Sequence, residues 1–121
     1  MQTLLQAIAR EEGFYAPGSR PSRNCNPGDL NFEPWEESFG AKLETPLGSE
    51  AARFACFPSV TEGFAAMRHL LLTEYAGLTL EAALNKWAPP SDGNDTSAYL
   101  ASVSEWTGMS ANTILTADLI G

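Results

Sequence analysis

The sequence predicts an α+β fold that is mainly helical, with a small antiparallel sheet of two or three strands. Apolar residues recur at helical spacing near the N-terminus and again after residue 58. Between them, residues 30–57 contain short alternating pieces interrupted by Pro and Gly. Helices segregated from a minor sheet are typical of α+β domains. The length of 121 residues fits one domain, spanning 1–121.

Composition and charge limit the function classes. Hydrophobic residues make up 44% of the chain and charged residues 18%, which is ordinary for a globular domain. The net charge of −8, from 15 acidic and 7 basic residues, argues against nucleic acid or an anionic membrane surface as the main partner. No apolar run approaches the roughly 18–20 residues of a membrane span, so stable membrane insertion is not expected.

The same totals bear on location and cofactors. No basic segment followed by an apolar core stands at the N-terminus, so no signal peptide is visible. The protein is expected either to stay in the cytoplasm or to be delivered by another route. Cys25 and Cys56 form no CxxC pair, and the single histidine, His69, has no metal-ligand spacing to them. We therefore expect no metal and no other cofactor.

A first helix is predicted over Thr3–Gly13, with an apolar face made by Leu4, Leu5, Ile8 and Ala9. Glu12 lies close to that face, whereas Glu11 is turned away from it. A carboxylate at the C-terminal end of a helix meets the unfavourable end of the helix dipole, and partial burial adds to this. Both effects raise the pKa, which suits a general acid near neutral pH. The alternative is a solvated Glu in a frayed last turn.

A loop is predicted over Phe14–Arg23, and the residues Asn26-Pro27-Gly28-Asp29 after it are typical of a tight turn. Pro27 presets its own φ, and Gly28 is expected to supply a positive φ. This dense turn either leads simply into a hairpin or also lines a binding site. Three short strands are predicted in this part of the chain: Leu30–Phe32, Ala41–Glu44 and Arg53–Phe57.

Helices follow to the end of the chain. Ser59-Val60-Thr61-Glu62 is a capping-box pattern that opens a helix to about Glu74, apolar almost all round, with His69 as a core or boundary residue. The remaining predicted helices are Thr79–Trp87, Thr96–Thr107 with Asn94 or Asp95 as its cap, and Ala111–Leu115. The tail Ala117–Gly121 is expected to fray.

Several short motifs follow one another along the chain in an order that can be compared with known families. They are Ala7-Ile8-Ala9-Arg10-Glu11-Glu12-Gly13, Arg23-Asn24-Cys25-Asn26-Pro27-Gly28-Asp29-Leu30, Phe54-Ala55-Cys56-Phe57-Pro58-Ser59, Glu62-Gly63-Phe64-Ala65-Ala66, Lys86-Trp87-Ala88-Pro89-Pro90, Asn94-Asp95-Thr96 and Tyr99-Leu100-Ala101-Ser102-Val103. This set resembles a family of small phage and bacterial lysozyme-like proteins marked by an Asn-Asn-Pro-Gly-Asn-(Leu/Ile) segment. Members are often labelled phage virion or structural proteins. The resemblance covers roughly residues 7–115.

The resemblance implies the lysozyme-like fold shared with soluble lytic transglycosylases, in which a catalytic Glu ends a helix between a sheet lobe and a helical lobe. Glu12, followed by Gly13, fits that catalytic position better than Glu11. Glu12 would protonate the glycosidic oxygen of peptidoglycan, in a lytic transglycosylase or in a muramidase. A muramidase would need a second carboxylate, for which Asp29, Glu33 and Glu44 are candidates.

The resemblance also suggests residues that support the reaction or bind the glycan. Tyr99 would orient Glu12 or would be a core Tyr, and Trp87 would be core or stack on a sugar. Trp35 would stack on a sugar or anchor its loop. Asn94 is a further substrate-binding candidate. Asn26 and Asp29 would fix the backbone around Glu12 and contact sugar.

Two positions depart from the family pattern. Cys25 replaces a polar residue, and Asp29 stands where Asn is common. Because Cys56 would lie in the strand beside the Asn-Pro-Gly segment, a Cys25–Cys56 disulfide is one outcome and two free thiols the other. Asp29 either raises the pKa of Glu12 further or is only a turn residue.

The expected partners are peptidoglycan glycan strands and phage particle components. The protein would then act at the bacterial cell wall or in the periplasm, delivered by phage or by another secretion route. The competing hypothesis is a non-catalytic lysozyme-like module, either a virion structural protein or a wall-binding domain, which the acidic charge favours. A wall endopeptidase is less favoured because the chain has no Cys–His or zinc constellation.

Overall fold

Six α-helices and two 3₁₀-helices accompany a two-stranded antiparallel sheet in the computed structural model, which describes residues 1–121. The predicted α+β, mainly helical fold class is confirmed. The elements in chain order are α1 (Leu4–Glu11), α2 (Arg20–Arg23), η1 (Pro34–Phe39), β1 (Lys42–Leu43), β2 (Ala55–Cys56), α3 (Val60–Glu74), α4 (Leu80–Trp87), η2 (Pro90–Asp92), α5 (Thr96–Thr107) and α6 (Ala117–Ile120). None of these helices is long and apolar enough to span a membrane.

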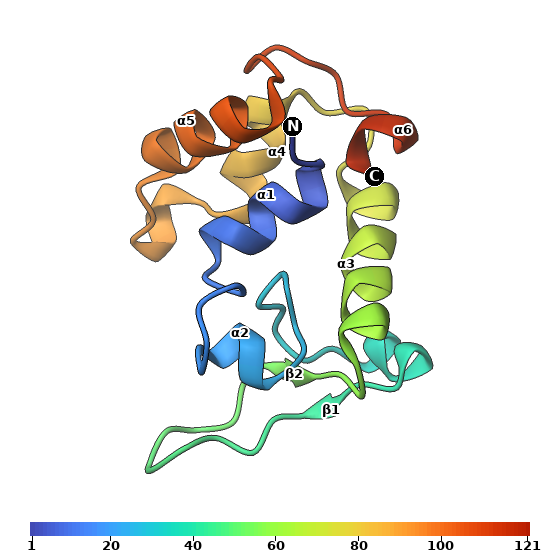
Figure 1. The fold of residues 1–121 in the computed structure, drawn as a ribbon, viewed down its shortest axis with the longest axis vertical. Helices are drawn as coiled ribbons and strands as arrows, with labels where there is room; N and C mark the ends of the chain where they lie inside the picture. The colour runs from blue at the N-terminus through green and yellow to red at the C-terminus, as the bar shows by residue number, and fades with distance from the viewer.

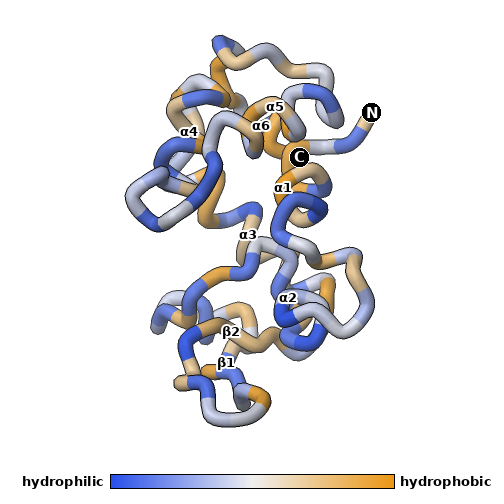
Figure 2. Tube along the Cα trace, turned by 90° about the vertical axis from the view of Figure 1, so that its left-hand side faces the viewer, coloured by the Kyte–Doolittle hydropathy of each residue, from blue (hydrophilic) through white to orange (hydrophobic).

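The elements form two lobes (Figure 1). α1, α4, α5 and α6 make a helical lobe, and α2, β1 and β2 lie in a smaller lobe at the other end of the molecule. α3 runs alongside both, and the view turned by 90° shows the same two groups (Figure 2). Helix α1 packs against α3, α5 and α6, while η1 packs against α3. The end of α1 therefore faces the junction of the two lobes.

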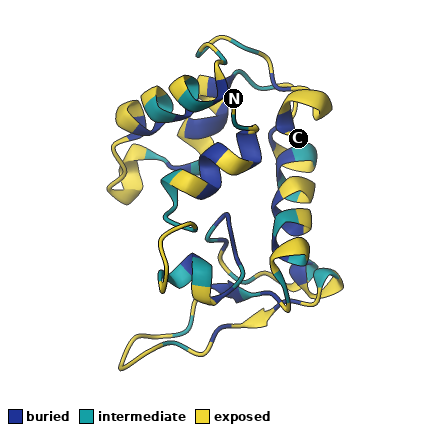
Figure 3. Cartoon of the chain, in the orientation of Figure 1, coloured by how far each residue is buried: buried dark blue, intermediate teal, exposed yellow.

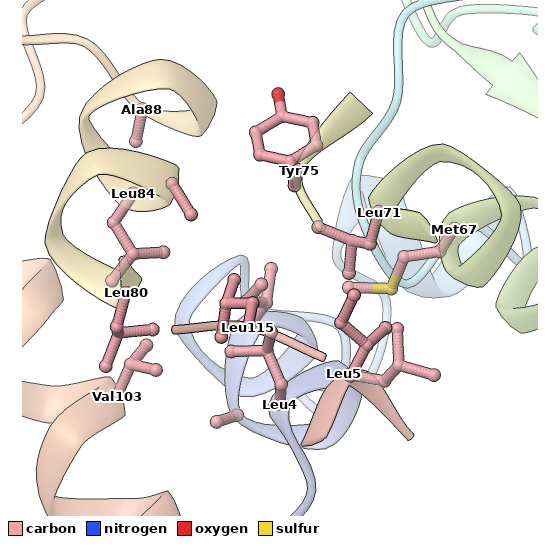
Figure 4. Close-up of a cluster of buried hydrophobic side chains, with 14 of the residues drawn as sticks. Leu4, Leu5, Met67, Leu71, Tyr75, Leu80, Leu84, Ala88, Val103 and Leu115 are labelled. Carbon is pink, nitrogen blue, oxygen red and sulfur yellow. The ribbon is translucent and has the colours of Figure 1, made fainter. Parts of the chain in front are cut away.

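The larger core lies inside the helical lobe. Burying each such aliphatic side chain contributes about 1.5–3 kcal/mol. The larger core contains 15 buried residues, of which Figure 4 labels Leu4, Leu5, Met67, Leu71, Tyr75, Leu80, Leu84, Ala88, Val103 and Leu115. A second cluster of 5 buried residues fills the smaller lobe: Leu30, Ala41, Ala55, Phe57 and Ala66. Figure 3 shows the buried faces of α1 and α3 turned inward.

Helix α1 forms where it was predicted. Thr3 caps it with a capping box, in which the amide of Gln6 donates to Thr3 Oγ1 at 3.2 Å and the amide of Thr3 donates to Gln6 Oε1 at 3.0 Å. The predicted apolar face is buried. Glu12 is the C-cap residue, and Gly13 adopts a φ of 85°, which ends the helix.

The prediction of a loop throughout Phe14–Arg23 is wrong, because its last four residues form α2. Ser19 is the N-cap, and its hydroxyl accepts from the amide of Ser22 at 3.3 Å. Pro21 lies in the first helical turn, where a missing N–H costs nothing and the fixed φ favours the helix. The short helix brings Arg20 to the junction of the lobes.

The sheet is antiparallel and two-stranded, within the predicted two or three strands. β1 and β2 lie inside the predicted strands Ala41–Glu44 and Arg53–Phe57, but each is shorter than predicted. β1 pairs with β2 in the register Lys42↔Cys56 and Leu43↔Ala55. The strand expected over Leu30–Phe32 is reduced to one bridge, Asn31↔Phe54. Two backbone hydrogen bonds flank this bridge, from the Ala55 amide to the Leu30 carbonyl and from the Phe32 amide to the Arg53 carbonyl, both at 3.0 Å, and the chain then enters η1 at Pro34.

Helix α3 begins after Ser59 and ends at Glu74, as predicted. The predicted capping bond is absent, since the Ser59 hydroxyl donates to the carboxylate of Glu62 instead of accepting from the helix backbone. The expectation of an all-round buried helix is also wrong. Only one face is buried, and His69 is exposed, with its ring against those of Trp35 and Phe39 at 5.5 and 5.6 Å. His69 is thus a boundary residue.

The C-terminus differs most from the prediction. Residues 111–115 are not helical, because their backbone pairs with the α3–α4 connection: the amide of Leu115 donates to the Leu78 carbonyl at 2.8 Å, and the amide of Leu80 donates to Thr113 at 2.9 Å. The tail does not fray, since it forms α6 with Thr116 as N-cap. Ile120, 0% exposed, anchors it in the core.

The Asn26-Pro27-Gly28-Asp29 turn also departs from expectation in its backbone. Gly28 has no positive φ, and the residues that have one are Cys25 (50°) and Asp29 (48°). Gly28 instead serves close packing, because a Cβ there would lie 3.2–3.3 Å from side-chain atoms of Leu30, Met67 and Trp87. The turn is thus pressed between α3 and the end of α4.

Candidate active site

A cavity of about 520 Å³ opens between the lobes. Its wall takes residues from the end of α1, from α2, from the Asn-Pro-Gly turn, from η1 and from the segment just before β2. The ends of α3 and α4 and the segments that follow them complete it. The residues that the sequence singled out and that line this cavity are Glu12, Asp29, Glu33, Trp35, Trp87 and Asn94. The residues singled out by the sequence therefore converge on one space, with three exceptions, Tyr99, Asn26 and Glu44.

The surroundings of Glu12 raise the pKa of its carboxyl group. It sits at the C-terminal end of α1, and burial raises its pKa, while hydrogen bonds from Tyr99 and Trp87 act in the opposite direction. The negative charges of Asp29 and Glu11 raise it further. The net direction is upward, as the sequence predicted. Glu11 does not line the cavity, which agrees with the preference for Glu12.

Two donors hold one oxygen of Glu12. The Tyr99 hydroxyl donates to Oε2 at 2.8 Å, and the Trp87 indole N–H donates to the same oxygen at 3.4 Å. Burial and the charge of Glu12 both raise the pKa of Tyr99, so its hydroxyl keeps its proton and remains a donor. Oε1 of Glu12 has no protein donor. That oxygen is the one free to exchange a proton with a ligand.

Tyr99 reaches Glu12 from beneath the cavity wall. It is only 6% exposed and belongs to the helical core, yet its hydroxyl faces the carboxylate. Tyr99 is therefore both a core residue and a donor to Glu12, the two roles between which the sequence left a choice. Direct sugar contact by Tyr99 is not supported, because the side chain does not line the cavity.

Trp87 is a donor that sequence reasoning missed. It is half-buried, with its ring packed edge-on against Tyr75 at 5.6 Å and its N–H turned towards Glu12. It was expected to be core or to stack on sugar. The only signal available was its place just before Ala88-Pro89-Pro90, where α4 ends and the chain meets the cavity.

Asp29 is paired with Arg20. The guanidinium Nε donates to Oδ1 at 3.1 Å, and Nη2 donates to Oδ2. Arg20 also lies over the Phe54 ring, 3.6 Å from its centroid. Asp29 raises the pKa of Glu12, as the first of the two sequence interpretations proposed. It is also a turn residue, as the second interpretation proposed.

Trp35 and Asn94 lie at the edges of the cavity. Trp35 projects from η1, half-buried, with its ring edge-on to Phe39 at 6.0 Å. Asn94 is exposed, and its amide donates to the Pro89 carbonyl at 3.2 Å. Asp95, rather than Asn94, caps α5. Both side chains remain accessible to a ligand.

The structure does not support the predicted sugar contact by Asn26. Its side chain is 0% exposed and does not line the cavity. Its amide N donates to the carbonyls of Leu30 at 2.9 Å and Ala55 at 3.0 Å, and its oxygen accepts from the Leu30 amide at 2.9 Å. With its amide fully used by the backbone, Asn26 holds the turn against β2 beneath the cavity.

The candidates for a second carboxylate have different surroundings. Glu44 is buried away from the cavity. Burial alone would raise its pKa, but the amides of Phe54 and Arg53 and the side chain of Asn24 donate to it and hold its pKa below the ordinary value. Asp29 is paired with Arg20. Glu33 alone is exposed on the cavity wall.

Glu36 is a carboxyl group that sequence reasoning missed. It is 0% exposed, and burial raises its pKa to about 7. One oxygen accepts from the amide of Glu33, while Oε2 has no partner. The pattern Glu33-Pro34-Trp35-Glu36, with Pro at a first-turn position and Glu at N3, was the available signal of a helical start.

The two cysteines do not line the cavity, and no metal-binding cluster is found. Cys25 and Cys56 are free thiols, so of the two outcomes for them the structure has the unbonded one. No three His, Cys, Asp or Glu side chains are grouped in a way that would hold a metal ion.

No family model, no curated protein and no solved structure matches this chain. The class of function is therefore inferred from the site itself. The site offers a carboxyl with a raised pKa at the end of a helix, two donors on one of its oxygens, and an open cavity lined by the half-buried ring of Trp35. This arrangement can deliver a proton to a polar group of a ligand and take it back.

Proposed function

We propose that this protein is a peptidoglycan-degrading glycosidase of lysozyme-like fold, with Glu12 as the general acid and base. The observation that carries the proposal is the environment of Glu12, which raises its pKa while Tyr99 fixes its orientation. A carboxyl group with a raised pKa holds its proton to a higher pH than an ordinary Glu, and it can then protonate a glycosidic oxygen as the bond to the sugar breaks. The cavity between the lobes, with Trp35 on its wall, suits an extended sugar chain.

Lytic transglycosylase is the favoured reaction class within this proposal. Retaining and inverting hydrolases use a second free carboxylate facing the first. Here Asp29 is occupied by Arg20 and Glu44 by backbone amides, which leaves Glu33 alone among the candidates. In a transglycosylase, Glu12 gives its proton to the leaving oxygen and then takes one from the sugar's own 6-hydroxyl as that group closes on the anomeric carbon. The product is an anhydro-sugar end.

The test is zymography on purified peptidoglycan with matched variants. Wild type should clear the gel, and Glu12→Gln should lose at least about 10²-fold in activity because the proton donor is gone. Glu11→Gln is the control, since this neighbour does not line the cavity. It should keep activity, with the alkaline limb of the pH profile moved only slightly to lower pH because its charge no longer raises the pKa of Glu12. Mass spectrometry of the released fragments should find anhydro-sugar ends, whereas reducing ends would indicate a muramidase.

Two outcomes would contradict the proposal. Equal clearing by wild type and Glu12→Gln would remove Glu12 from the chemistry. Intact sacculi that nevertheless sediment with the wild-type protein would favour the competing hypothesis, a non-catalytic wall-binding or virion structural module.

A further inference from the structure

Two arginines line the cavity of an otherwise strongly acidic protein. Arg20 and Arg53 are two of only 7 basic residues, against 15 acidic ones. Both guanidinium groups lie over the ring of Phe54, at 3.6 Å for Arg20 and 5.0 Å for Arg53. Helix α2 and the segment before β2 therefore bring together, at one end of the cavity, two positive charges that lie 33 positions apart in the sequence (53 − 20).

Arg20 is already neutralised and fixed. Its pairing with Asp29 uses Nε and Nη2, and the Phe54 ring covers one face of the guanidinium. This arrangement orients Arg20 and leaves the two N–H groups of Nη1 and the second N–H of Nη2 as its remaining donors. It also places a fixed planar group beside Arg53.

Arg53 has no carboxylate partner. The chain has two ion pairs, Arg20–Asp29 and Lys86–Glu74, and Arg53 belongs to neither. Its Nε donates to Asn31 Oδ1 at 3.0 Å, which orients the guanidinium but does not neutralise it. Both Nη groups are free on an exposed side chain at the cavity wall. A fork of free N–H donors in fixed orientation matches a carboxylate.

We infer that Arg53, supported by Arg20, binds a carboxylate of the substrate, so that the protein prefers glycan strands carrying acidic peptide substituents over neutral ones. The inference rests on the proposed function and deepens it by naming the substrate class. It is also compatible with the net charge of −8, because recognition would come from short-range contacts at this end of the cavity and not from long-range attraction to an anionic polymer.

The experiment compares two probes on the Glu12→Gln variant, which would bind without turnover. The first is a peptidoglycan tetrasaccharide with its stem-peptide carboxylates free, and the second is the same fragment with those carboxylates converted to methylamides. Neither probe carries phosphate, so wall phosphate polymers cannot supply the anion. Titration calorimetry should give about tenfold tighter binding of the free-carboxylate probe, in line with hydrogen bonds to a charged group.

A second substitution locates the effect. Arg53→Gln in the same background should weaken binding of the free-carboxylate probe about tenfold and leave the methylamide probe within about twofold. Arg23→Gln is the matched control, because Arg23 is exposed and does not line the cavity, so it should change neither. The two probes are also compared on the Glu12→Gln variant with all of its arginines intact. That comparison does not depend on how the Arg53→Gln variant folds.

Three results would overturn the inference. Equal affinity for the two probes would mean that no carboxylate is recognised, and an equal loss in Arg23→Gln would assign the effect to overall charge. In both cases the proposed function would survive, because the glycan still binds. Binding of neither probe would remove the inference and the proposed function together.

Discussion

The hydroxyl of Tyr99 donates a 2.8 Å hydrogen bond to Glu12 Oε2, joining residues that lie 87 positions apart in the chain. The bond connects the end of α1 to the buried face of α5, the pair of helices that pack most closely in the helical lobe. It stabilises the carboxylate and so limits how far burial raises the pKa of Glu12. Tyr99 thereby couples the helical core to the protonation of the proposed general acid.

Substitution Tyr99→Phe should move the alkaline limb of the pH–activity profile to higher pH. The lost hydroxyl removes an interaction that lowers the pKa of Glu12, so the carboxyl stays protonated to a higher pH. The maximum rate should fall about tenfold, because Glu12 loses its best orienting donor. Steady-state rates on soluble glycan fragments from pH 4 to 9 would check this. An unchanged limb would mean that the bond does not act on Glu12.

Substitution Asp29→Asn should move the same limb the other way, to lower pH. Asp29 raises the pKa of Glu12, so removing its charge and leaving Arg20 unpaired both favour the Glu12 carboxylate. Asn tolerates the left-handed φ of 48° at this position, so the turn should persist. Thermal unfolding would confirm the fold. A limb that moves upward would contradict the assigned electrostatic role of Asp29.

Glu36 should make the protein less stable as the pH rises towards 7. Its pKa is raised from the ordinary 4.5 to about 7, so the folded state holds the proton more tightly than the unfolded state. The stabilisation is complete below pH 4.5 and is lost as the pH rises through about 7, a change of about 3 kcal/mol. Substitution Glu36→Gln keeps an oxygen for the Glu33 amide and should remove this part of the pH dependence.

The measurement for Glu36 is urea unfolding at pH 4 and pH 8. Glu36→Gln should match wild type at pH 4 and exceed it at pH 8. Glu37→Gln serves as the control because Glu37 is exposed in the same 3₁₀-helix, and it should follow wild type at both values. A Glu36→Gln variant that loses stability at pH 8 would show that the buried carboxylate is compensated by other groups.

Substitution Gly63→Ala should destabilise the fold by about 3 kcal/mol or more. A Cβ at this position would lie 2.0 Å from the carbonyl oxygen of Cys25 and 2.8 Å from Pro27, so α3 would have to move away from the turn. Helix propensity alone would favour Ala by about 1 kcal/mol. Ala65→Gly makes the reverse exchange at an exposed position of α3 and should cost only about 1 kcal/mol in urea unfolding. A stabilised Gly63→Ala would disprove the close approach.

Local patterns sufficed for several helices and for the position of Glu12. α1, α3, α4 and α5 begin and end close to where their apolar spacing and caps predict, because the helical period and the capping residues act within one or two turns. The same period places Glu12 near the buried face of α1. These parts depend on neighbours in the chain, and the sequence shows them directly.

The partners of Glu12 needed the tertiary structure. The motif order pointed to Tyr99, but its hydrogen bond, the indole donor of Trp87 and the pairing of Asp29 with Arg20 join distant segments. Arg20 escaped notice because Pro21 suggested a loop, although proline suits the first turn of a helix. Glu36 escaped notice because an exposed-looking acidic stretch gives no sign that one of its members is buried.

The sequence by itself therefore determined the fold class, the main helices and the place of a buried carboxyl at the end of the first one. The tertiary structure alone decided how short the strands are, the course of the last eleven residues, and which side chains meet around Glu12. The physical reason is the range of the interactions. Periodicity and capping act over a few residues, whereas burial, charge pairing and the raised pKa of Glu12 arise only when both lobes close around one cavity.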